Sequence, residues 1–94
     1  MAVHEIRSQA ARTDSGVLLR TVDRETMRVE FRGRVMHVPV DRGLGSYGFY
    51  LPVAPTWDDE TAVSSEDLEL VKAAIVEIQR HWGFGVDFHV LEVD

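Results

Sequence analysis

Residues 64–82 constrain the fold most, because no other stretch of this 94-residue chain is long and periodic enough to predict a helix. Apolar side chains recur along it at steps of three and four residues, which places them in one stripe of an α-helix: Leu68, Val71, Ile75, Ile78 and Trp82. Ser64 is a good N-cap residue, and Gly83 can adopt the left-handed conformation that ends a helix. The fold must therefore give one amphipathic helix an apolar surface to cover.

Five other stretches predict β-strands: residues 17–22, 26–32, 35–40, 47–51 and 86–91. In the second stretch, Met27, Val29 and Phe31 alternate with charged residues, which is typical of a half-buried antiparallel strand. Gly33 permits a tight hairpin into the third stretch. Pro39 indicates that this third strand lies at an edge of the sheet or ends near Pro39, because proline donates no ladder hydrogen bond.

The element order is thus four strands, one helix and one strand. It predicts an α+β fold, a mostly antiparallel twisted sheet of about five strands with the helix packed across one face. The surface under the helix is expected to be formed by five side chains: Met27, Val29, Phe31, Val38 and Phe88. Residues 1–15 show no sustained pattern and are expected to be a partly disordered segment, and residues 16–94 to form a single domain.

Composition excludes several classes of protein. The chain has no cysteine, which excludes thiol catalysis, disulfides and a Cys-ligated zinc site. No apolar run approaches the roughly 18 residues of a membrane span, and charged residues near the start argue against a signal peptide. We therefore expect a soluble, cytoplasmic protein with no membrane partner.

The net charge of −6 is unevenly distributed. Residues 1–47 carry eight basic residues and six acids, a net charge of +2, whereas residues 48–94 carry two basic residues and ten acids, a net charge of −8. Nucleic acid is therefore not expected as a partner, because phosphate repels the acidic half. A basic protein would be attracted to it, although acidity alone also serves solubility.

Two sequence patterns suggest cofactor binding or catalysis, but the residues around them do not support either function. Gly43, Gly45 and Gly48 match the spacing G-x-G-x-x-G, but a dinucleotide site needs a helix to begin directly after the glycines, and a strand follows here. Ser46 lacks the setting of a nucleophile. The four histidines have no metal-binding spacing: His4, His37, His81 and His89. We therefore expect no catalytic, cofactor-binding or metal-binding residues, and no enzyme activity.

The connection before the helix holds the strongest candidate for partner binding. Trp57 either folds back onto the sheet or stands exposed as an interface anchor, and three acids follow it: Asp58, Asp59 and Glu60. Tyr50 is a candidate neighbour. Glu66 and Glu69, on the outer face of the helix, extend the surface toward the area that a protein interface requires. We expect this surface to bind a basic partner protein.

The same features resemble a known family. A strand hairpin around Gly33, an aromatic strand with Phe49 and Tyr50, a connection containing Trp57, a Ser-capped helix and a final strand led by Gly85 follow one another in this order. This arrangement resembles the small immunity proteins of bacterial polymorphic toxin systems, in particular immunity protein 74. The resemblance implies a cytoplasmic, non-enzymatic protein that neutralises a cognate toxin domain by direct contact.

Two alternatives come from other classes of protein. A small ligand-binding domain or enzyme would use residues 43–50, and would require a pocket with convergent polar groups there. A homodimeric structural subunit would pair through an exposed strand edge at residues 35–40.

Overall fold

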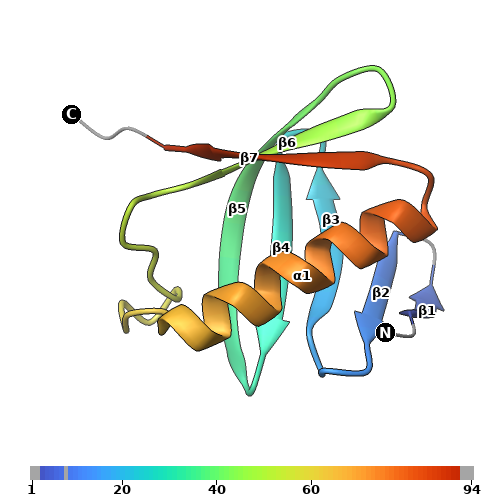
Figure 1. Ribbon diagram of the computed structural model, residues 1–94. Helices are drawn as coiled ribbons and strands as arrows, with labels where there is room; N and C mark the ends of the chain where they lie inside the picture. The colour runs from blue at the N-terminus through green and yellow to red at the C-terminus, as the bar shows by residue number, and fades with distance from the viewer. Residues whose placement is uncertain (1–2, 8, 92–94) are drawn as a thin grey trace.

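The computed structural model describes residues 3–7 and 9–91, which form one seven-stranded sheet and one helix (Figure 1). The elements are β1 (Val3–Arg7), β2 (Ala10–Thr13), β3 (Leu18–Asp23), β4 (Thr26–Phe31), β5 (Arg34–Arg42), β6 (Ser46–Leu51), α1 (Ser65–His81) and β7 (Gly85–Val90). The strands lie in the sheet in chain order, and every neighbouring pair is antiparallel except β6 and β7. The predicted α+β class is confirmed, with seven strands instead of about five.

The two additional strands are β1 and β2, which lie in the segment that was expected to be partly disordered. Ala10, Ala11 and Thr13 of β2 are buried. Of all the strands, β2 and β7 lie nearest to α1. Small side chains such as Ala11 let the helix approach β2 closely. The same small side chains carry no apolar alternation, which is why the sequence did not predict this strand.

The hairpin between β4 and β5 follows the prediction from Gly33. Phe31 pairs with Arg34, and the two residues between them both have positive φ, 53° at Arg32 and 77° at Gly33. Two such residues define a type I′ turn, whose twist matches that of the strands. Each inward-facing residue of β4 is buried, namely Met27, Val29 and Phe31.

Strand β5 lies between β4 and β6 in the strand order, but its residues 34–39 have a strand partner on one side only, which agrees with the edge position indicated by Pro39. It pairs with β4 up to Pro39 and with β6 from Val40 onward. The N–H of Val40 donates to the Glu25 carbonyl at 2.8 Å, so the pair Thr26–Pro39 beside it is a non-hydrogen-bonded pair of the antiparallel ladder. Proline is tolerated at this position because its missing N–H would not have pointed at β4.

The ends of α1 are as predicted. The side chain of Ser64 accepts a hydrogen bond from the N–H of Asp67 (3.1 Å). At the other end Gly83 has φ 90° and donates to Arg80 O, and Phe84 donates to Gln79 O at 2.8 Å. These two bonds form a Schellman motif, which directs the chain from the helix into β7.

The core lies between α1 and the sheet. The buried residues of α1 are Val71, Ala74, Ile75, Ile78 and Gln79. Met27, Val29, Phe31 and Val38 are buried beneath the helix as predicted, and Phe88 is partly buried beside them. Trp82 is only partly buried, at the margin of this cluster.

Candidate functional site

Trp57 is buried, with 2% of its surface exposed. It belongs to the core cluster, although it comes from the connection between β6 and α1. Of the two placements that the sequence left open, the exposed interface anchor is therefore wrong. An indole ring buries a large apolar area, which favours packing against the sheet over exposure in a polar loop.

The backbone around Trp57 forms a small hairpin, residues 56–62, which we name the acidic hairpin. Thr56 and Ala62 form an antiparallel bridge at its base. The N–H of Trp57 donates to Thr61 O, and the N–H of Glu60 donates to Trp57 O, both at 2.8 Å. The acids Asp58, Asp59 and Glu60 thus lie together at an exposed turn whose backbone is internally hydrogen-bonded.

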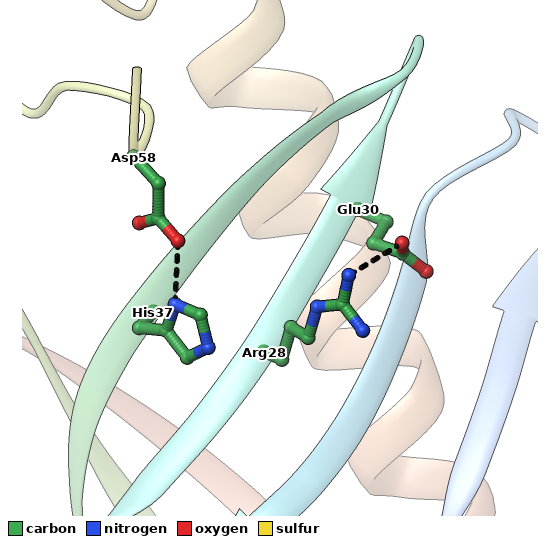
Figure 2. Close-up of polar contacts among 4 residues, drawn as sticks. All are labelled: Arg28, Glu30, His37 and Asp58. Carbon is green, nitrogen blue, oxygen red and sulfur yellow. Dashed lines mark hydrogen bonds and ion pairs between the residues drawn. The ribbon is translucent and has the colours of Figure 1, made fainter. Parts of the chain in front are cut away.

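Asp58 fixes the acidic hairpin to the sheet. Its N–H donates to Val35 O at 2.7 Å, and its Oδ2 lies 2.6 Å from Nδ1 of His37. Figure 2 shows this contact beside the ion pair between Arg28 and Glu30 (3.0 Å), with the helix behind the strands. These side chains therefore lie on the face of the sheet opposite α1. The contact of Asp58 with Val35 also occupies part of the strand edge that the homodimer alternative requires.

Asp59 is held within the acidic hairpin by Thr61. Its Oδ1 accepts from the Thr61 hydroxyl and from the Thr61 N–H, the latter at 3.0 Å. The hydroxyl bond and the backbone bond lower the pKa of Asp59 below its ordinary value, with a smaller contribution from the Arg34 charge. Arg34 in turn donates to the Thr61 hydroxyl at 3.1 Å. Asp59 is therefore fully ionised at neutral pH.

The remaining predicted residues are divided between two places. Glu66 and Glu69 are exposed on the N-terminal half of α1, which follows the acidic hairpin in the chain. Tyr50 lies on β6, where its ring stacks on His89 with 5.1 Å between centroids. The structure thus brings Asp58, Asp59 and Glu60 together, places two helix acids next along the chain, and gives Tyr50 a different neighbour.

Three basic side chains that sequence reasoning did not combine lie beside the acidic hairpin. Arg20 of β3 lies opposite Arg28 of β4, and Arg28 lies opposite His37 of β5. They line a shallow groove together with Asp58. On their three strands these residues occupy positions that face the same side of the sheet. The sequence alone could not show that they are neighbours, because this depends on the register between the strands.

A pocket of about 900 Å³ lies near the C-terminal end of α1. Tyr47, from the region named by the ligand-binding alternative, lines it, as does Gln79. Gln79 is fully buried and was not identified from the sequence, because a single glutamine beside an apolar stripe usually faces solvent. Gln79 lies four residues after Ile75 and therefore on the same side of the helix, which was the one signal in the sequence that it is buried.

Gly43 and Gly45 lie in a strand connection, as predicted, whereas Gly48 lies within β6. Gly43 donates to Ser46 O at 2.8 Å, and Gly45 has φ 77°. Strand β6 begins at Ser46, where a dinucleotide site requires the start of a helix.

Within residues 3–7 and 9–91, no three His, Cys, Asp or Glu side chains gather as metal ligands would. In the same part of the chain, the helix is neither long nor apolar enough to cross a membrane.

Comparison with known proteins found no match among family models, curated proteins or solved structures. The resemblance to immunity proteins therefore depends on the sequence features alone.

Proposed function

We propose that this chain is a non-enzymatic, cytoplasmic binding protein of the immunity type, which neutralises a basic toxin domain by direct contact. The observation that carries the proposal is the acidic hairpin: three adjacent acids on a short turn that the rest of the molecule holds in place. The acids supply the charge, and the turn supplies a fixed geometry for that charge.

Fixed geometry matters because ordering a loop on binding costs free energy. Bonds from Asp58 to β5 and from Asp59 to Thr61 are present in the free protein, so little ordering remains to be done when a partner arrives. Trp57 is buried beneath the turn, so it supports the acidic hairpin through core packing and does not contact the partner itself. Complementary charge then raises the association rate with a basic surface such as a nuclease cleft.

The acidic hairpin alone is too small for a stable interface, which buries about 800 Å² on each partner. Glu66 and Glu69 extend the proposed surface along the exposed side of α1. Tyr50 is outside this surface as we define it, because its ring is engaged with His89.

The test is a rescue assay with a toxin domain encoded beside this gene, combined with binding kinetics. Reversing Asp58, Asp59 and Glu60 to Lys should slow association and weaken its salt dependence, with a loss of affinity of about tenfold or more. The matched control reverses three exposed acids on other elements: Asp14, Glu25 and Asp87. It has the same net charge and should bind nearly as well. Equal losses for the two triple variants would contradict the proposed surface, and no binding by the unmodified protein would contradict the pairing itself.

One observation favours a second candidate, a small ligand-binding domain. The pocket near the end of α1 includes Tyr47 and adjoins the glycine-containing turn. The homodimer alternative would use the edge of β5 at residues 35–39, which pairs with β4 alone, but the N–H of Asp58 already donates to Val35 O at that edge.

A further inference from the structure

The pocket of about 900 Å³ is formed where the turn between β3 and β4, the facing parts of β5 and β6, and the C-terminal end of α1 converge. Its volume is within the range of small-molecule sites. Most of its residues fall into three groups: an apolar base with one buried amide, an aromatic wall, and a charged rim; Gln9 and Thr21 also line it. Each group restricts what the pocket can bind.

The amide belongs to Gln79, whose side chain is completely buried. Its Nε2 donates to the sulfur of Met27 at 3.4 Å, and its Oε1 has no hydrogen-bond partner. The sulfur is a weak acceptor, so the carboxamide is held with its N–H toward Met27 and its oxygen free. A buried acceptor without a partner destabilises the fold, and a ligand with an N–H or O–H donor would satisfy it.

The aromatic wall consists of Tyr47, Trp82 and Phe84. Tyr47 and Phe84 meet edge to face at 5.0 Å between centroids, and the guanidinium of Arg42 lies 5.2 Å from the Phe84 ring. Trp82 is only partly buried, so part of its indole is accessible. Because Arg42 already lies over Phe84, Trp82 offers the aromatic surface on which a further flat or cationic group can stack.

The rim is acidic. Four carboxylates line the pocket, those of Glu5, Asp23, Glu25 and Asp41, against the two guanidinium groups of Arg24 and Arg42. The carboxylates outnumber the guanidinium groups by four to two. The field at the opening therefore favours a positively charged ligand.

We infer that this pocket binds a small planar cation with N–H donors, of the amidinium or guanidinium class. Gln79 Oε1 is inaccessible in the free protein, so the side chain turns toward the pocket on binding and accepts an N–H of the ligand. The flat face of the ligand lies against Trp82, and the rim carboxylates balance its charge. This site is at the other end of α1 from the acidic hairpin and does not depend on the proposed toxin binding.

Benzamidine is a direct probe, because it joins an aromatic ring to an amidinium group. A titration followed by amide and indole NMR signals should give saturable shifts of the Trp82 indole and the Gln79 carboxamide, while the Trp57 indole signal stays in place. Neutral benzamide, of nearly the same shape, should bind at least about tenfold more weakly. No saturable shift up to about 10 mM benzamidine, or equal binding of benzamide, would overturn the inference.

Two variants test the named groups. Gln79→Met keeps the length of the side chain and removes the free acceptor, so it should weaken benzamidine binding about tenfold or more while the protein remains folded. The exposed pair Asp23→Asn with Asp41→Asn should weaken binding several-fold, whereas Asp14→Asn with Asp87→Asn, away from the pocket, should not. Unchanged binding by a folded Gln79→Met protein overturns the inference. If that protein does not fold, equal binding by the two double variants overturns it.

Discussion

The acidic hairpin directly precedes the N-terminal end of α1, a 17-residue helix about 25 Å long (Figure 1). The pocket lies near the C-terminal end of the same helix. Among the described residues, each region holds one buried side-chain atom without a hydrogen-bond partner, Nε1 of Trp57 and Oε1 of Gln79. At Trp57 the large apolar area of the ring offsets the cost of the unpaired N–H. Gln79 has little apolar area to offset its free oxygen, and it lines a pocket.

This difference separates a structural role from a binding role. The unpaired N–H of Trp57 accompanies a ring that fills the core behind an ordered turn, so its burial is explained by packing. The unpaired oxygen of Gln79 is not explained by packing, because an apolar side chain of the same volume would fill the site without that cost. The following predictions test whether the two residues differ in this way, beginning with the largest expected effect.

Trp57→Ala should reduce the free energy of unfolding by about 3 to 5 kcal/mol, because it removes a fully packed aromatic ring from the core. Trp57→Phe is the control, since it keeps an aromatic ring and removes the unpaired N–H, and should lose far less. Urea unfolding of both variants measures the difference. A loss below about 1 kcal/mol for Trp57→Ala would show that the ring does not hold the acidic hairpin.

The sequence predicted those parts of the fold whose signals are local. The helix boundaries follow from Ser64 and Gly83, and the hairpin between β4 and β5 follows from Gly33, because caps and tight turns depend on a few adjacent residues. Strand β2 and the pairing of β5 with β6 from Val40 onward depend on partners elsewhere in the chain, and no local pattern reports them.

In the candidate sites, too, the sequence predicted what depends on adjacent residues and did not predict what depends on distant ones. The adjacency of Asp58, Asp59 and Glu60 is visible in the sequence, whereas the burial of Trp57 and Gln79 is decided by tertiary packing. The contact between Asp58 and His37 joins residues 21 positions apart and needed the register of β5.

Trp82→Ala should cost about 1 to 3 kcal/mol, less than Trp57→Ala, because Trp82 is only partly buried at the margin of the core. The sequence alone predicted a full core position for this residue, as the last member of the apolar stripe. The same urea experiment ranks the two tryptophans. If Trp82→Ala lowers the free energy of unfolding more than Trp57→Ala does, then Trp57 is not the main buried aromatic support of the fold.

Gln79→Met should have the opposite sign and raise the free energy of unfolding by about 1 kcal/mol, because it removes the unpaired buried oxygen and preserves volume. Thermal unfolding without added ligand measures it. A loss of more than about 1 kcal/mol would show that the carboxamide contributes more through its contact with Met27 than its free oxygen costs. Gln79 would then be a structural residue, like Trp57.

The smallest effect concerns Asp59, whose pKa is lowered in the folded protein by its hydrogen bonds to Thr61. A lowered folded pKa stabilises the protein at pH values above the unfolded pKa of about 4, where Asp59 is ionised in both states. This stabilisation is lost as the pH falls from about 4 through the folded pKa, because the unfolded chain takes up the proton first.

Asp59→Asn removes the titration, so the difference in melting temperature between the two proteins should shrink between about pH 5 and pH 2. A constant difference for Asp59→Asn across that range would mean that Thr61 does not hold the Asp59 carboxylate in solution, and that the acidic hairpin is less ordered than its hydrogen bonds indicate.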